Sequence, residues 1–276
     1  PESRFFLESY LYALQAYENE GAVLSRGVFH AAKSEAEKQR FQKLVRQAAL
    51  PPSHMRWDTG EFDLQGLNFS KGLVIEPAQT CRKFAQGATC IKARVASIQK
   101  TERGYAVYDQ SRDVIARGSH ILVASGAGIK SFSDFDELSL RYSRGQVTQA
   151  KAPLQTTLTY GGYGIPFRGD TLIGATHARL GSDDPYLPTS HDDCENLEKF
   201  TAMTGLDAQV IVGGSRASVR VTRANTLPLV YKNDNLCVLT ALGSRGFVFA
   251  PLLAETLVSM ICNEVHACLP ASLHVT

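Results

Sequence analysis

The sequence has no long apolar run, no CxxC pair and little net charge. No apolar stretch approaches the ~18 residues that a membrane-spanning helix needs, so we expect no membrane association. The 29 Lys and Arg against 27 Asp and Glu leave a net charge of +2, too small by itself to indicate a nucleic-acid binder. These absences favour an ordinary globular protein, and 44% hydrophobic residues are enough for a large core.

The cysteines show no Cys/His spacing that is typical of a metal site. We therefore predict no metal, and interpret the cysteines as reduced, mostly buried thiols of a cytoplasmic protein. The length of 276 residues predicts one large domain or two smaller interleaved ones. The cysteines in question are Cys81, Cys90, Cys194, Cys237, Cys262 and Cys268.

The first third of the chain predicts two amphipathic helices. Apolar residues recur at helical spacing from Arg4 to Glu20, and Gly21 is expected to end that helix. Ser34 begins a possible capping box for a second helix, which stops before Pro51. The outer face of the second helix is basic, which indicates either a solvated face or a contact with RNA phosphates. Those cations are Lys33, Lys38, Arg40, Lys43 and Arg46, and Arg82, Lys83, Lys92 and Lys100 are further candidates downstream.

The rest of the chain predicts an α/β core that is interrupted by a strand-rich middle. Gly145 to Arg220 reads mainly as strands with glycine turns, apart from one helix that Ser190 and Asp193 can cap and Gly205 ends. Pro77 is expected to start another helix. The remaining predicted strands are Leu73–Ile75, Ile91–Ile98, Tyr105–Tyr108, Val114–Ala116 and Ile121–Ala124.

The segment from Leu236 to Cys262 is the most informative part of the sequence. An apolar run breaks at Gly243-Ser244-Arg245-Gly246 and then enters a predicted helix with Pro251 in its first turn. A helix start presents unpaired N–H groups and a positive dipole end, and glycine lets a ligand approach the backbone. Residue types alone leave two interpretations open, a turn that closes a sheet and a site for an electron-rich ligand.

Several motifs together resemble the FAD-dependent amine oxidases of the D-amino-acid oxidase and glycine oxidase superfamily. Within that superfamily, the resemblance is greatest to the oxidoreductase half of bifunctional enzymes that modify the tRNA wobble uridine. The similarity is strongest from Gly161 to Ile261. The motifs are Ala124-Ser125-Gly126-Ala127, Gly161-Gly162-Tyr163, Gly174-Ala175-Thr176-His177, the run from Arg220 to Val230, and Ala241–Gly246 with Ala250-Pro251-Leu252.

The resemblance implies a mixed α/β fold with two interleaved domains. One would be a Rossmann-like FAD-binding domain that is incomplete at its N-terminus, and the other an antiparallel-sheet substrate domain. Residues 1–25, 72–133 and 220–270 would form the FAD domain. Residues 26–71 and 134–219 would form the substrate domain.

The resemblance also implies roles for individual residues. Arg220 and Arg245 match the positions at which glycine oxidases hold a substrate carboxylate, whereas Arg223 is expected at the surface. Tyr163 and His177 could border the site, although packed or surface roles remain open for both. Val95, Ser125, Gly126 and Ala127 would meet the adenosine side of FAD, and Gly243, Ser244, Arg245, Gly246 and Phe247 the pyrimidine edge of the flavin.

The activity that the resemblance implies is oxidation of the carboxymethylaminomethyl group on the wobble uridine of tRNA, with release of glyoxylate. Molecular oxygen could reoxidise the flavin, and a fused S-adenosylmethionine-dependent methyltransferase domain is expected in the full protein. One alternative is a free glycine, sarcosine or D-amino-acid oxidase of the same fold. Another is a fragment without flavin that interacts but does not catalyse.

The sequence departs from the superfamily pattern in two respects. It contains no GxGxxG motif, which such enzymes use to hold the pyrophosphate of FAD, so we expect a truncated domain that binds FAD poorly. Asn225 stands where the pattern usually has Asp, which puts one loop or cofactor contact in doubt.

Overall fold

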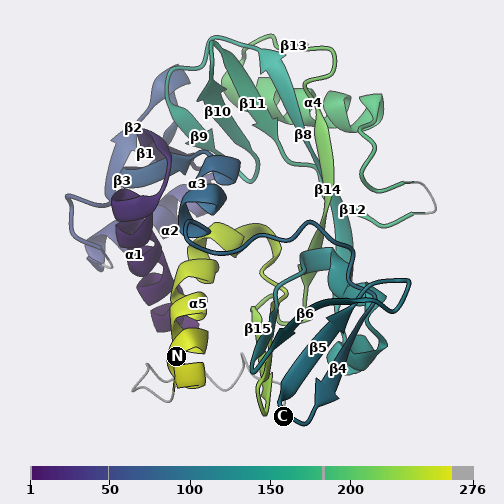
Figure 1. The fold of residues 1–276 in the computed structure, drawn as a ribbon. Coiled ribbons are helices and arrows are strands. Elements are labelled where there is room, and N and C mark those ends of the chain that lie inside the picture. The colour runs from purple at the N-terminus through teal and green to yellow at the C-terminus, as the bar shows by residue number, and fades with distance from the viewer. Residues whose placement is uncertain (1, 49, 182–183, 263–276) are drawn as a thin grey trace. The chain divides into compact units, whose positions relative to one another are not determined.

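The computed structural model describes residues 2–48, 50–181 and 184–262 (Figure 1). Cys268 and the end of the predicted range 220–270 lie outside the described residues. The chain divides into two units, of which the first holds Pro1–Ala16, Ala85–Tyr142 and Arg220–Thr276, and the second Tyr17–Phe84 and Ser143–Val219. Their roles as FAD and substrate domains stay predictions.

The first unit is built around a mixed three-stranded sheet of order β15-β16-β7, in which β15 is antiparallel and β7 parallel to β16. An antiparallel meander, β4-β5-β6, forms a second small sheet. The elements are α1 (Glu2–Glu20), β4 (Ser97–Thr101), β5 (Gly104–Tyr108), β6 (Val114–Gly118), β7 (Ile121–Val123), η2 (Gly126–Ser131), η3 (Ser133–Leu138), β15 (Leu229–Asn233), β16 (Leu236–Thr240), η4 (Gly243–Arg245) and α5 (Gly246–Cys262). The last turn of α1 belongs to the second unit.

Apolar side chains cover both faces of the sheet in the first unit. On one face, Phe5 of α1 stacks on Phe249 of α5 with ring centroids 5.4 Å apart, and both pack with Val230 and Leu239. On the other face, Val238 packs with residues of η2 and η3. Burial of these side chains removes apolar surface from water, which is the main force holding the helices to the sheet.

The second unit is dominated by a ten-stranded sheet of order β12-β8-β11-β10-β9-β1-β3-β2, with β13 and β14 also paired to β8. β1 and β9 form a parallel pair, and the other pairs along this order, together with that of β13 and β8, are antiparallel. The fully buried Phe200 of α4 packs against this sheet. The elements are β1 (Val23–Ala31), α2 (Glu35–Arg46), β2 (Arg56–Thr59), η1 (Glu61–Asp63), β3 (Gln65–Ile75), α3 (Pro77–Phe84), β8 (Arg141–Lys151), β9 (Thr157–Thr159), β10 (Tyr163–Phe167), β11 (Asp170–Gly174), β12 (Ala178–Arg179), α4 (Ser190–Thr204), β13 (Gln209–Val210) and β14 (Arg216–Thr222).

Several local predictions are confirmed. Gly21 follows the first helix and its amide donates to the carbonyl of Tyr17, at 2.9 Å. The Ser34 hydroxyl accepts from the amide of Glu37, so the predicted cap of α2 is present. Gly205 ends α4 in the left-handed region with a φ of 70°. The mixed α/β fold class is also confirmed.

The predicted strand Ile91–Ile98 is wrong over most of its length, because residues 91–96 form no strand and β4 begins at Ser97. Alternating apolar residues indicate a strand only where a neighbour supplies a hydrogen-bonding ladder, and pairing with β5 starts at Ser97 opposite Tyr108. Pro251 is also not in the first turn of its helix. It lies inside α5, which already begins at Gly246.

Two predictions from composition are also wrong. Cys81, Cys90, Cys194 and Cys262 are exposed, and among the described cysteines only Cys237 is buried, so these thiols are not mostly buried. The stretch Gly243–Cys262 is long and apolar enough, by length and composition, to cross a membrane, contrary to the expectation that no such run exists. The core helix of a soluble protein passes the same test, and α5 buries Phe249, Leu253 and Leu257 in the core of the first unit.

Candidate functional site

The junction from β16 into α5 has the strand-turn-helix form that the sequence predicts. β16 ends at Thr240, and the chain turns through Ala241 and Gly243, with φ values of 58° and 57°. A short 3-10 turn, η4, then leads directly into α5 at Gly246. The first N–H groups of such a helix have no partner inside the helix, so this end can bind an anionic or electron-rich group.

Gly243 fits closely against the end of β14. A β-carbon placed on Gly243 would come 3.0 Å from Cγ2 of Thr222. Side chains two residues apart on a strand point to the same face, so Arg220 shares a face of β14 with Thr222. The end of β14, from Arg220 to Thr222, belongs to the first unit. Within that unit, the turn therefore lies beside the strand face that bears one of the two predicted carboxylate-binding arginines.

Arg245 is exposed and lies against an aromatic ring of α1. Its guanidinium carbon is 5.5 Å from the ring centroid of Phe6, which itself makes an edge contact with Phe249. No described carboxylate forms an ion pair with Arg245. The cation is thus held by packing while its N–H donors remain available to a ligand.

A cavity of about 780 Å³ opens beside β7 within the first unit. Val95 and Ser125, two of the residues expected at the adenosine side of FAD, line it together with Gly128. Gly126 follows Ser125 with a φ of 56°, and a β-carbon there would meet no atom within 4 Å. The cavity has the size of a small-molecule site and the open glycine backbone allows close approach, so the residues present fit the adenosine end of FAD.

Tyr163 and His177 both belong to the second unit. Tyr163 of β10 pairs with Gly174 of β11, and its ring covers that glycine, because a β-carbon on Gly174 would come 2.8 Å from the Tyr163 hydroxyl. His177 is exposed, and its Nε2 lies 3.3 Å from the Ser143 hydroxyl. Roles for these residues in catalysis stay predictions.

The basic face of α2 is partly neutralised. Lys38 forms an ion pair with Glu35, and Arg40 with Glu37. Elsewhere, Lys100 forms an ion pair with Asp234. Exposed pairs of this kind still leave cations at the surface, and the choice between a solvated face and an RNA contact stays open.

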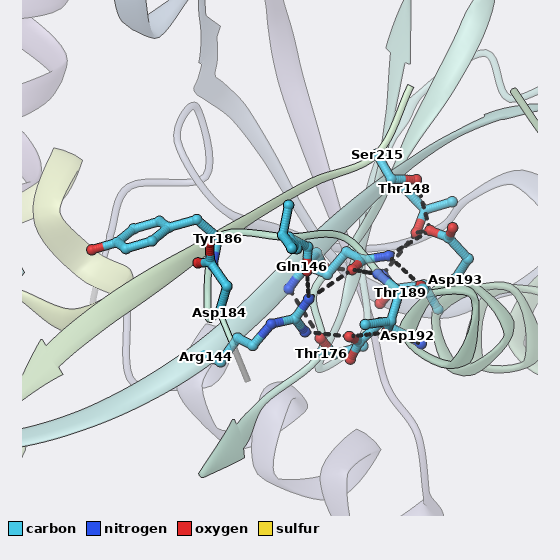
Figure 2. Close-up of polar contacts among 12 residues, drawn as sticks. Arg144, Gln146, Thr148, Thr176, Asp184, Tyr186, Thr189, Asp192, Asp193 and Ser215 are labelled. Atoms are coloured by element: carbon cyan, nitrogen blue, oxygen red, sulfur yellow. Dashed lines mark hydrogen bonds and ion pairs between the residues drawn. The ribbon is translucent and has the colours of Figure 1, made fainter. Parts of the chain in front are cut away.

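A buried polar network in the second unit was missed at the sequence level (Figure 2). Arg144 of β8 forms an ion pair with Asp192 of α4, and their side chains are only 12% and 8% exposed. Gln146 donates to the carboxylate of Asp193 at 2.7 Å, and so does the Ser215 hydroxyl at the same distance. Together these bonds tie the start of α4 to β8 of the sheet.

The network also decides how α4 begins. Thr189, rather than the predicted Ser190 or Asp193, is the N-cap, because its hydroxyl oxygen accepts from the amide of Asp192. Burial would raise the pKa of Asp192, but hydrogen bonds from Thr189, Thr176 and Arg144 outweigh it and lower that pKa. The signal available in the sequence was the alternation of polar residues at 144, 146 and 148, which lie on one face of β8.

The first unit thus holds a mixed sheet whose strand β16 leads through a glycine turn into α5, and the second unit holds a broad, mainly antiparallel sheet. Residues 1–260 match the family described as FAD dependent oxidoreductase. The chain belongs to this family.

Curated relatives are similar along nearly the whole chain. The tRNA 5-methylaminomethyl-2-thiouridine biosynthesis bifunctional protein MnmC of Caulobacter vibrioides is 33% identical over 275 residues, which are 95% of this chain and 46% of that protein. The protein of the same name from Maricaulis maris is 30% identical over 97% of this chain and 43% of its own length. The chain therefore spans less than half the length of these relatives.

Solved structures share the fold at low sequence identity. Iminodiacetate oxidase from Chelativorans sp. BNC1 superposes with a TM-score of 0.79 at 18% identity, over 99% of this chain and 83% of that one. Glycine oxidase from Geobacillus kaustophilus gives a TM-score of 0.76 at 18% identity, over 98% and 81%.

Proposed function

We propose that this chain is the oxidoreductase part of a tRNA-modifying enzyme, which removes a carboxymethyl group from the amine of 5-carboxymethylaminomethyl-(2-thio)uridine at the wobble position. The observation that carries the proposal is the Gly243 turn packed beside the face of β14 that bears Arg220. The similarity to the MnmC proteins supports tRNA as the substrate, and with it a cytoplasmic location. Their bifunctional nature supports a second activity, which we infer to be a methyltransferase, in the full protein.

The reacting end of that substrate is an N-substituted glycine, so the site must hold a carboxylate. Arg220 and Arg245 supply guanidinium groups in the same unit as the turn. A guanidinium can bind a carboxylate through two parallel hydrogen bonds, which fixes the carbon between amine and carboxylate. A fixed carbon is what a hydride transfer needs, because the reaction depends on close and oriented approach.

FAD fits the first unit at two places. Val95, Ser125, Gly126 and Ala127 would hold its adenosine side, where the cavity beside β7 lies. Gly243, Ser244, Arg245, Gly246 and Phe247 would lie along the pyrimidine edge, at the start of α5. When bound, FAD accepts a hydride from the carbon between amine and carboxylate. The N–H groups and positive dipole end of α5 would stabilise negative charge at that edge.

The remaining chemistry needs little help from the protein. Loss of hydride from the substrate leaves an imine, and addition of water splits it into glyoxylate and the aminomethyl uridine. Tyr163 and His177 are the candidates for handling a proton, and molecular oxygen is the proposed final electron acceptor. No described residue is assigned as a base, because the substrate's ammonium form needs to lose only one proton to become the neutral amine that is oxidised.

The test is product analysis with FAD in excess. We expect glyoxylate release from tRNA that carries the carboxymethylaminomethyl group, and no hydrogen peroxide from glycine, sarcosine or D-alanine. Peroxide from the free amino acids without glyoxylate from tRNA would instead identify a free amino-acid oxidase. Neither product, with no flavin absorbance in the protein after removal of excess FAD, would identify a fragment that does not catalyse.

A further inference from the structure

The exposed side chain of Arg245 lies against an aromatic ring instead of extending into solvent. Its guanidinium carbon is over the Phe6 ring, 5.5 Å from the ring centroid. A cation within ~6 Å of the centroid is attracted by the negative face of the ring. Phe6 belongs to α1 and Arg245 to η4, both in the first unit, so the contact is a tertiary one that the start of α5 does not make by itself.

The core of the first unit fixes the Phe6 ring. Phe6 makes an edge contact with Phe249, with ring centroids 5.7 Å apart and ring planes at 87°. Phe249 is only 1% exposed and stacks on Phe5. Phe249 also follows Arg245 by four residues, the spacing that places two side chains on one side of a helix. Phe6 is therefore a fixed surface against which both the core phenylalanine and the arginine lie.

The charge of Arg245 is not neutralised by this arrangement. Glu8, which is next to the contact on α1, forms an ion pair with Arg4 at 2.7 Å. Glu255 of α5 lies at the Tyr12 hydroxyl, whose pKa is raised by burial and by this carboxylate. No carboxylate in the described part of the chain pairs with Arg245. Its guanidinium is thus held in place while it can still bind an anion.

An aromatic ring suits this purpose better than an ion pair. A carboxylate of the protein would accept from the same fork of N–H donors that a substrate carboxylate needs, and the two would compete. A ring attracts the cation without taking up that fork. A long exposed side chain otherwise samples many rotamers, and that freedom is lost when a ligand binds. Contact with Phe6 restricts the rotamers of Arg245 before the substrate arrives.

We propose that Phe6 is a positioning residue for Arg245, whose guanidinium its ring holds at the start of α5 with the N–H donors available to the substrate carboxylate. The inference rests on the proposed function for the role of Arg245. Phe6 acts only through Arg245 and is assigned no contact with substrate or FAD. A substitution of Phe6 should therefore matter only while the arginine is present.

The kinetic experiment compares Phe6→Leu with Phe6→Tyr, with FAD in excess. Phe6→Leu removes the ring, and Phe6→Tyr keeps it. We expect Phe6→Leu to raise KM for tRNA that carries the carboxymethylaminomethyl group about two- to fivefold with little change in kcat, because an exposed cation–ring contact is lost. Phe6→Tyr should keep the original KM. In an Arg245→Gln background, Phe6→Leu should have no further effect.

A second measurement needs neither FAD nor turnover. Phenylglyoxal reacts with guanidinium groups, and peptide mass spectrometry gives its rate of reaction at Arg245 alone. Phe6→Leu should raise that rate about two- to fivefold, because the ring no longer restrains the side chain. Phe6→Tyr should leave the rate unchanged. Phe6 is 41% exposed, so we expect leucine to be tolerated there, and Phe6→Met replaces Phe6→Leu if urea unfolding shows that it is not.

Leu11→Ala is the matched control. Leu11 is an apolar residue of the same helix with a similar exposure of 40%, and it follows Phe6 by five residues, which places it on a different side of α1. Its alanine variant should change neither KM nor the rate of reaction with phenylglyoxal.

Three results would each overturn the proposal. They are an unchanged KM in Phe6→Leu, an equal effect of Phe6→Leu with and without Arg245, and equal phenylglyoxal rates in Phe6→Leu and the original protein. Absence of glyoxylate release from the original protein would contradict the proposed function instead. The phenylglyoxal rates would then decide by themselves whether Phe6 holds Arg245.

Discussion

The side chain of Thr222 lies close to Gly243 and crowds the position that a β-carbon on Gly243 would take. The Cγ2 atom of Thr222 lies 3.0 Å from the place a β-carbon would take, and the φ of Gly243 is +57°. Two independent constraints, one steric and one conformational, therefore favour glycine at the turn that leads from β16 to the candidate flavin edge.

We expect Gly243→Ala to lower the free energy of unfolding by more than the ~1 kcal/mol that a left-handed backbone conformation costs a residue with a β-carbon. Gly126→Ala is the matched control, because Gly126 has a φ of +56° but no atom within 4 Å of its β-carbon position. Urea unfolding of both variants measures the difference. Equal losses would mean that the Thr222 contact relaxes at no cost.

The carboxylate-binding role of the arginines predicts a kinetic effect. Arg220→Gln and Arg245→Gln should each lower kcat/KM for the glycine-type substrate by about 10- to 100-fold, because a charge-assisted bidentate contact is lost. Arg117→Gln, which removes an exposed arginine from β6 of the same unit, should leave it unchanged. Arg220→Gln and Arg245→Gln should unfold at the same urea concentration as the original protein. If a loss of stability accounts for the whole fall in kcat/KM of a variant, the arginine replaced in it has a structural role instead.

The N-cap of α4 is Thr189 in the structure, whereas the sequence predicted Ser190 or Asp193. Thr189→Ala should lower the free energy of unfolding by about 1 kcal/mol, because the amide of Asp192 loses its acceptor. Ser190→Ala should be nearly neutral, since Ser190 is the first helical residue and its side chain caps nothing. Thermal or urea unfolding measures both. A larger loss of stability in Ser190→Ala than in Thr189→Ala would instead support Ser190 as the N-cap.

The ion pair between Arg144 and Asp192 predicts a dependence of stability on pH. The pKa of Asp192 is lowered in the folded protein, so its carboxylate stabilises the fold above the unfolded value of ~3.9. That contribution is lost as the pH falls through the lower folded value. Asp192→Asn should lower the free energy of unfolding at neutral pH by about 3 kcal/mol, because it leaves Arg144 buried without its anion.

The difference between Asp192→Asn and the original protein should shrink below about pH 4, as the carboxyl of the original protein takes up its proton. Urea unfolding between neutral and acidic pH measures it. Asp207→Asn removes an exposed carboxylate from the same unit and should be close to neutral throughout. A constant difference across the range would show that Asp192 does not titrate differently in the folded state.

Local signals predicted much of the fold. Gly21 and Gly205 end their helices where expected, because a helix end depends on the conformation and hydrogen bonds of a few neighbouring residues. The junction at Gly243 was predicted for the same reason, since glycines and a change of period stand next to each other there. The absence of a strand at residues 91–96 was not predictable in this way, because a strand requires a partner from elsewhere in the chain.

In the candidate site, too, some features depend on neighbours along the chain and others on residues far apart in the sequence. The sequence by itself determined the family motifs, the order of strand, turn and helix around Gly243, and the residue types that can hold a carboxylate, because these depend on neighbours along the chain. Only the tertiary structure decided that Thr222 crowds the β-carbon position of Gly243, that Asp192 pairs with Arg144, and that Gln146 donates to Asp193. Those contacts join residues far apart in the sequence, and they form only when the sheet and helices pack together and exclude water.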